Sequence, residues 1–156
     1  SKKRFSKNER TESKLLKVIL DTNIFISSIL TGGGIPSQII NSWRRKLLFD
    51  LIISEEIIDE LKRVLARLKL PSEIIQEWDD ILRKYAYFVV PSQKIEIIKE
   101  DPSDNKFLEC ALEVHADYIV SGDKHLLKIK KIEKTKIFTA RFFLDLLYTS
   151  SLPNAK

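Results

Sequence analysis

The sequence contains few of the residues from which disulfides, zinc sites and membrane spans are built. The single cysteine, Cys110, cannot close a disulfide within the chain, and the two histidines, His115 and His125, have neither cysteine partners nor a zinc-ligand spacing. No uncharged apolar run approaches the roughly 18 residues that a membrane helix needs, and no apolar signal segment follows the basic start. We therefore expect a soluble protein of the cytoplasm with no membrane partner.

Several common catalytic arrangements are also missing. The sequence has no Gly-x-Ser-x-Gly motif, so it lacks the sharp turn that presents a nucleophilic serine. The triple glycine at 32–34 is not followed by the Lys-Ser/Thr pair of a phosphate-binding loop, which indicates a turn instead. Helical spacing places Cys110 on the opposite side of its helix from Asp104, which argues against a thiol nucleophile.

The net positive charge of the chain comes entirely from its first residues. The net charge is +5, and residues 1–17 account for all of it with seven basic and two acidic side chains. A chain of 156 residues that is 44% hydrophobic and 31% charged has room for one globular domain. We expect a basic, flexible arm over 1–14, a folded domain over 15–149 and a tail over 150–156. The arm is either a solvated extension or a contact for phosphates.

The apolar pattern predicts an α/β fold. Short, branched apolar runs indicate strands, and apolar positions at helical spacing indicate helices between them. Strands are expected at 15–20, 49–54, 86–90, 117–123 and 136–139, and helices at 24–30, 37–48, 55–68, 72–84, 101–115, near 125 and at 140–147. Strands that alternate with helices pair in parallel through right-handed crossovers. The sequence therefore predicts one domain with an open, parallel sheet of about five strands and helices on both faces.

Four carboxylates occur where a packed core is not expected to place them. Asp21 and Asp123 end two apolar strands, so both are expected at the carboxyl edge of the sheet, where ligands bind in open α/β folds. Asp104 lies in the first turn of a helix on the same side as its apolar residues, and Glu60 borders the apolar stripe of another helix. Each acid alone has an ordinary explanation, as a helix N-terminal charge, an Asx turn or a solvated side chain.

Together, the four acids predict a site for a divalent cation. Neighbouring carboxylates raise each other's pKa, and burial raises it further, so such a group needs a counter-charge. Lys106 and Lys124 are close to the acids in the sequence, but we expect both side chains to point elsewhere. Oxygen ligands without histidine or cysteine are typical of the hard ions Mg²⁺ and Mn²⁺.

Four motifs occur in an order that resembles a known family. They are VILDTNIFISSIL at 18–30, SEEIIDELKRVL at 54–65, DPSDNKFLECAL at 101–112 and ADYIVSGDKHLL at 116–127. Together they resemble the PIN domain family, and within it the VapC-like toxins of prokaryotic toxin–antitoxin pairs. The resemblance extends from about residue 17 to residue 147.

The resemblance implies a metal-dependent endoribonuclease that hydrolyses the phosphodiester bonds of RNA. The acids that match the family's catalytic and metal-binding positions are Asp21, Glu60, Asp104 and Asp123. The residues that match or extend its supporting positions are Asn23, Ser121 and Asp101. The resemblance also implies Mg²⁺ or Mn²⁺ as the cofactor, a homodimer, and a cognate antitoxin protein that occupies the acidic cleft.

Two other functions fit the same residues. Asp21, at the end of the first strand, could serve as the nucleophile of a Mg²⁺-dependent phosphotransfer domain that forms an aspartyl phosphate. Against this, Asn23 stands where such enzymes usually carry a second aspartate. The third hypothesis is a non-catalytic module that binds RNA or protein through its basic arm.

Overall fold

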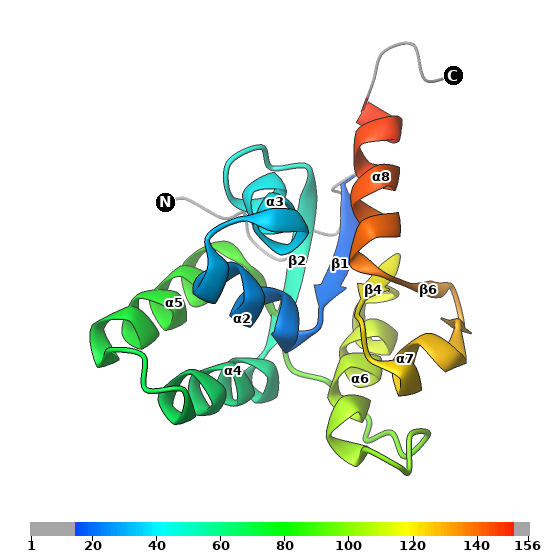
Figure 1. Ribbon diagram of the computed structural model, residues 1–156. Helices are drawn as coiled ribbons and strands as arrows, with labels where there is room; N and C mark the ends of the chain where they lie inside the picture. Colours follow the sequence, from blue (N-terminus) through cyan, green and yellow to red (C-terminus); the bar gives the residue numbers. More distant parts are fainter. Residues whose placement is uncertain (1–14, 152–156) are drawn as a thin grey trace.

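The computed structural model describes residues 15–151 as a sheet with helices packed on both faces (Figure 1). The expected arm over 1–14 lies outside the described residues, as do residues 152–156 of the expected tail. In spatial order, the strands are β3 (Tyr87–Val89), β2 (Phe49–Ser54), β1 (Leu16–Leu20), β4 (Tyr118–Val120), β6 (Thr135–Phe138) and β5 (Lys131–Ile132). The predicted α/β class is confirmed.

Five of the six strands are the predicted ones, and they pair in parallel. The sixth, β5, was not predicted; it pairs antiparallel with β6 at the edge of the sheet. It was missed because it spans only two residues, which is too short for an apolar alternation to register. The sheet therefore has the five expected parallel strands and, in addition, a short antiparallel strand at its edge.

The helices follow the predicted spacing with small differences at their ends. They are α2 (Thr22–Thr31), α3 (Gly34–Arg44), α4 (Glu55–Arg67), α5 (Ser72–Tyr85), the 3₁₀ turn η1 (Pro102–Asp104), α6 (Asn105–Val114), α7 (Lys124–Ile129) and α8 (Ala140–Ser151). Gly32 ends α2 in the left-handed region at φ 69°, so the triple glycine forms the expected turn. The last helix continues to Ser151, into the segment expected as a tail. None of the helices within 15–151 is long and apolar enough to span a membrane.

The core lies on both sides of β2, whose six residues are all buried. The ring of Phe49 meets the ring of Phe143 in α8 edge to face, with centroids 5.3 Å apart. Ser54 lies an odd number of residues further along the strand and so on the opposite face, where it contacts Cys110 of α6. The helices α8 and α6 therefore cover opposite faces of the central strands.

The chain changes direction across the sheet between β1 and β4. From β1 the chain moves to β2 and then β3 on one side, whereas β4 and β6 lie on the other side. Leu20 at the end of β1 pairs with Val120 at the end of β4. In open α/β sheets such a switch point opens a crevice at the carboxyl ends of the strands. The residues that follow Leu20 and Val120 are Asp21 and Ser121.

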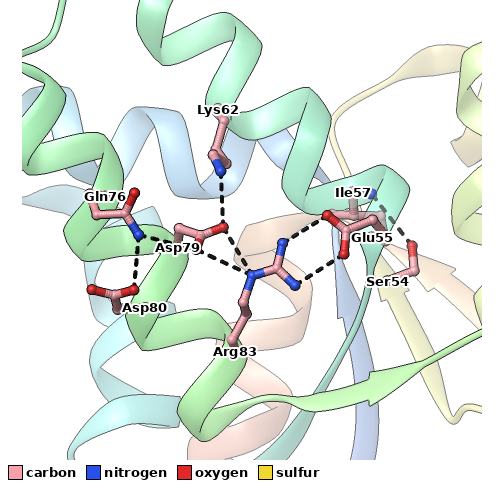
Figure 2. Close-up of polar contacts among 8 residues, drawn as sticks. All are labelled: Ser54, Glu55, Ile57, Lys62, Gln76, Asp79, Asp80 and Arg83. Carbon is pink, nitrogen blue, oxygen red and sulfur yellow. Dashed lines mark hydrogen bonds and ion pairs between the residues drawn. The ribbon is translucent and has the colours of Figure 1, made fainter.

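An ion-pair network fixes α4 against α5 (Figure 2). Buried Asp79 of α5 accepts hydrogen bonds from Lys62 of α4 at 3.2 Å and from the Arg83 Nε at 3.1 Å. Arg83 also binds both carboxylate oxygens of Glu55, at 3.0 and 2.7 Å. Burial alone would raise the pKa of Asp79, but the hydrogen bonds from Lys62 and Arg83 lower it below its ordinary value. The charged form of Asp79 therefore stabilises the helix pair at neutral pH.

We expect Asp79→Asn to lower the free energy of unfolding by about 1–3 kcal/mol at pH 7, because two charge-assisted hydrogen bonds lose their charged acceptor. Urea denaturation followed by circular dichroism measures the change. The matched control is Asp80→Asn, since Asp80 is the exposed neighbour and, within residues 15–151, accepts only from Gln76. This control should change stability by less than about 0.5 kcal/mol. Equal effects of the two substitutions would contradict the assignment.

Candidate active site

A small pocket of about 130 Å³ lies beyond the carboxyl end of β1, and we call it the acidic pocket. Its lining residues are Asp21, Thr22, Asn23, Ile26, Glu60, Val64, Asp101, Ser103, Asp104 and Asp123. The four acids singled out in the sequence, and Asp101 with them, therefore reach one pocket from β1, α4, η1 and the end of the β4 segment. Ser121 lies behind this pocket rather than in its wall.

Asp21 is held in a fixed orientation by hydrogen bonds to both oxygens. It is 6% exposed, and its Oδ1 accepts from the backbone N–H of Asn23 at 3.1 Å as the N-cap of α2. Its Oδ2 accepts from the buried Ser121 hydroxyl at 2.6 Å. A carboxylate engaged on both oxygens is poorly placed to attack a phosphate, which disfavours Asp21 as the nucleophile of a phosphotransfer reaction. The contribution of Asn23 to holding Asp21 comes from its backbone.

Asp123 is fixed by the same kind of local contact. Its Oδ1 caps α7 by accepting from the backbone N–H groups of His125 at 2.7 Å and Leu126 at 3.1 Å. Its own N–H donates to the Ser121 hydroxyl oxygen at 2.9 Å. Ser121 thus links Asp21 to Asp123, so one side chain sets the positions of two acids.

Three acids converge most closely, and one of their oxygens has no partner. Asp101, Asp104 and Asp123 each offer a carboxylate oxygen, and these oxygens all lie within 4.8 Å of one another. Asp104 is 7% exposed, and its buried Oδ2 has no hydrogen-bond partner among residues 15–151. Buried polar atoms are almost always paired, so an orphaned carboxylate oxygen beside two others fits a divalent cation with oxygen ligands. Asp21 and Glu60 line the same pocket outside this closest group.

The electrostatics of the pocket oppose full ionisation. Burial, together with the negative charges of Asp123, Asp101 and Asp21, raises the pKa of Asp104 to about 7. Burial also raises the pKa of Asp21, although the hydrogen bonds from Ser121 and Asn23 act in the opposite direction. A cation in the pocket would remove much of this cost and restore the charged forms.

Lys106 corrects the expectation that it points away from the acids. Its ammonium lies 3.2 Å from Glu60 Oε1, and the side chain is only 7% exposed. It also donates to the carbonyl oxygen of Ser103 at 2.5 Å. The hydroxyl of Thr22 donates to the same Glu60 oxygen at 2.6 Å. Lys124, by contrast, is exposed and forms no ion pair within 15–151.

Thr22 and Lys106 are therefore site residues that the sequence analysis did not identify. Their shared partner, Glu60, lies 38 residues from Thr22 and 46 from Lys106 in the sequence, so no local spacing relates them. Lys106 lies in the buried first part of α6, where a lysine has to be paired, but the sequence alone does not show that burial. The thiol of Cys110 is not a further site residue: burial raises its pKa to about 11, which leaves it protonated and unreactive.

Residues 17–125 match the PIN domain family. The chain belongs to this family. A relative, the uncharacterized protein MJ1680 of Methanocaldococcus jannaschii, is 29% identical over 139 residues, which cover 81% of this chain and 83% of that protein. The part of the PIN domain that is matched runs from β1 to the first turn of α7 and includes every residue of the acidic pocket. PIN domains are generally nucleases and typically bind divalent metal ions, and this one has a carboxylate cluster of suitable composition.

We expect Asp104→Asn to stabilise this PIN domain in EDTA at pH 8. An unfolded aspartate titrates near pH 4, so between about pH 4 and pH 7 the folded state holds a proton that the unfolded state has released. The folded protein therefore loses stability as the pH rises through 7, by an amount on the order of 2–4 kcal/mol, and asparagine removes that loss.

Thermal unfolding of both proteins in EDTA, at several values between pH 4 and pH 8, measures this effect. The midpoint of Asp104→Asn should exceed that of the wild type by several degrees at pH 8, and the two should converge toward pH 4. Asp145→Asn, an exposed acid of α8, serves as the control and should show no such divergence. An Asp104→Asn variant less stable than wild type at pH 8 would contradict the electrostatic account.

Proposed function

We propose that this PIN domain is a metal-dependent endoribonuclease that hydrolyses RNA phosphodiester bonds at the acidic pocket. The observation that supports the proposal most directly is the unpartnered Oδ2 of buried Asp104, which lies within a group of three carboxylates. An arrangement that keeps like charges together at the cost of stability is typical of a functional site rather than of a packed core. Membership of a family of nucleases supplies the reaction class.

The chain offers distinct ligand and supporting roles for Mg²⁺ or Mn²⁺. Asp104, Asp123 and Asp21 are the proposed ligands, and Asp101 is close enough to Asp104 and Asp123 to join them. A divalent cation bound there would supply Lewis-acid stabilisation of the charge that develops on the phosphate during hydrolysis. Ser121 holds Asp21 in place, so the ligand set is preorganised before substrate arrives.

Glu60 has a different environment from the three aspartates. Thr22 and Lys106 both donate to its Oε1, so this oxygen is occupied and Oε2 is the one left to act in the pocket. The Lys106 ammonium, 3.2 Å from Glu60 Oε1, offsets part of the negative charge of the pocket. In the proposed reaction, Glu60 binds metal or orients the attacking water, and Lys106 holds Glu60 in position.

The finer biological role is proposed from the four sequence motifs and their resemblance to VapC-like toxins. On this proposal the protein is the toxin of a toxin–antitoxin pair, acts in the cytoplasm as a homodimer, and is silenced by a cognate antitoxin that covers the acidic pocket. Induced expression of the wild type alone should then arrest growth of a bacterial host, whereas Asp104→Asn should not. Equal growth of both cultures, with equal protein levels on a blot, would remove the toxin role and leave the nuclease proposal intact.

For the nuclease itself, Asp104→Asn should lower RNA cleavage by at least about 100-fold, because it removes a charged ligand from the centre of the cluster. Cleavage of fluorescently labelled single-stranded RNA in Mg²⁺, Mn²⁺ or EDTA measures the rate. Asp80→Asn, a surface change on α5, is the control and should cleave at the wild-type rate.

A second readout does not depend on catalysis. At a concentration of 100 times its dissociation constant, Mn²⁺ should stabilise the folded wild type by about 2.7 kcal/mol and so raise its unfolding midpoint. The rise for Asp104→Asn should be smaller. Cleavage that persists in EDTA, or in Asp104→Asn with metal, would overturn the proposed mechanism.

A further inference from the structure

The acids of the acidic pocket differ in whether the chain supplies a positive charge for them. Asp101, Asp104 and Asp123, which we call the aspartate cluster, each have a carboxylate oxygen within 4.8 Å of the other two. Within residues 15–151, no lysine or arginine forms an ion pair with any member of this cluster. Glu60 is different, because the Lys106 ammonium lies 3.2 Å from its Oε1.

The Lys106 ammonium is enclosed by protein. Its side chain is only 7% exposed. Besides contacting Glu60, the nitrogen donates to the carbonyl oxygen of Ser103 at 2.5 Å and lies 4.8 Å from the centroid of the Phe107 ring. A carboxylate, a carbonyl oxygen and an aromatic ring all stabilise a buried ammonium. Lys106 therefore provides a positive charge at a fixed place inside the protein.

This fixed charge lies at the edge of the acidic pocket. Ser103, whose carbonyl oxygen accepts from Lys106, lines the pocket and lies between Asp101 and Asp104 in the sequence. Glu60 lines the same pocket from α4. One side chain of α6 thus connects the turn that carries two of the aspartates with the helix that carries Glu60.

Few oxygens remain for a second metal ion. Within residues 15–151, the aspartate cluster is the only group of three or more histidine, cysteine or acidic side chains that brings its ligand atoms this close together. Outside the cluster, both oxygens of Asp21 accept hydrogen bonds. The Oε1 of Glu60 accepts from the Thr22 hydroxyl at 2.6 Å and ion-pairs with Lys106. A divalent ion beside Glu60 would also meet the ammonium as a like charge at close range, which opposes its binding.

The aspartate cluster, by contrast, has a buried oxygen that the chain leaves without a partner. This atom is Oδ2 of Asp104, a residue that is 7% exposed, and it has no hydrogen-bond partner among residues 15–151. Buried polar atoms are almost always paired, so this oxygen marks the cluster as the place for an added cation.

We propose that the acidic pocket binds one divalent metal ion, in the aspartate cluster, and that the Lys106 ammonium takes the place of a second ion beside Glu60. The inference rests on the metal site of the proposed function and adds the number of ions to it. Because Glu60 is paired with Lys106, it orients the attacking water and does not bind metal. Lys106 is a positioning residue, since it acts through Glu60.

The test counts the Mn²⁺ ions that the full chain binds in the absence of RNA. Isothermal titration calorimetry gives the number per chain, and EPR spectroscopy distinguishes an isolated Mn²⁺ ion from two ions coupled at close range. The wild type should bind one Mn²⁺ and show the spectrum of an isolated ion. Lys106→Met keeps the length of the side chain without its charge. This variant should bind a second, weaker Mn²⁺ at millimolar concentration and show the coupled spectrum.

The control is Lys124→Met, which should bind Mn²⁺ as the wild type does. Lys124 is next to Asp123 in the sequence, but it is exposed and forms no ion pair within the described part of the chain. Loss of a nearby positive charge is thus separated from loss of the charge beside Glu60.

A double variant keeps the test decisive if circular dichroism shows that Lys106→Met does not fold. Lys106→Met/Glu60→Gln removes both partners of the ion pair, so neither charge is left buried alone. It should bind one Mn²⁺ with an affinity within about threefold of the wild type, because Glu60 is not a ligand. Asp104→Asn removes a ligand and should weaken binding by about tenfold or more.

Three results would overturn the inference. They are two coupled Mn²⁺ ions in the wild type, a folded Lys106→Met that binds only one, and a loss of affinity of about tenfold or more in the double variant. Each leaves the nuclease proposal standing when the wild type cleaves RNA with metal. If the wild type binds one ion and Lys106→Met binds two, but neither cuts RNA, the nuclease proposal is wrong and the inference stands. A wild type that binds no Mn²⁺ contradicts both.

Discussion

The parallel pairing of β1 with β4 is the constraint on which the rest of the site depends. It places the residues after Leu20 and Val120 side by side, so that the Ser121 hydroxyl donates to Asp21 at 2.6 Å and accepts from the Asp123 N–H. Because the chain leaves these strands in different directions, nothing from the sheet fills the space beyond them. A one-residue shift of this register would turn Asp21 to the other face and separate it from Ser121.

The fold keeps several acids together by giving each a local partner rather than a shared counter-ion. Asp21 caps α2 and Asp123 caps α7, so backbone N–H groups at helix N-termini stabilise both negative charges. Glu60 has Thr22 and Lys106. Of the pocket acids, only Asp104 has a buried oxygen with no hydrogen-bond partner among residues 15–151, and burial beside the other acids raises its pKa to about 7. The unbalanced charge of the pocket is thus concentrated on one residue, which is where a bound cation would contribute most.

The sequence could predict the parts of this arrangement that depend on local pattern. An acid directly after a buried strand gives Asp21, and an acid on the apolar side of a helix gives Asp104. Asp123 was expected at the end of its strand, but β4 ends at Val120 and Asp123 is the N-cap of α7. Contacts between distant segments could not be predicted in this way. Lys106 meets Glu60 only because α6 packs against α4, and β5 forms only because β6 offers it an edge. The sequence predicts only a supporting role for Asp101. In the structure, the turn of η1 brings one of its carboxylate oxygens within 4.8 Å of those of Asp104 and Asp123.

The helix α4 connects the chemistry to the rest of the molecule. Glu60 lines the acidic pocket, Asp59 and Arg63 line a larger neighbouring cavity of about 610 Å³, and Lys62 binds Asp79 of α5. These residues lie on three sides of one helix, so the position of α4 sets all three together. The ion pairs with α5 (Figure 2) are made by Glu55 and Lys62 of α4, the helix that also carries Glu60. Loosening them would displace Glu60 and the α4 wall of the larger cavity by the same movement, because a helix moves as a rigid unit.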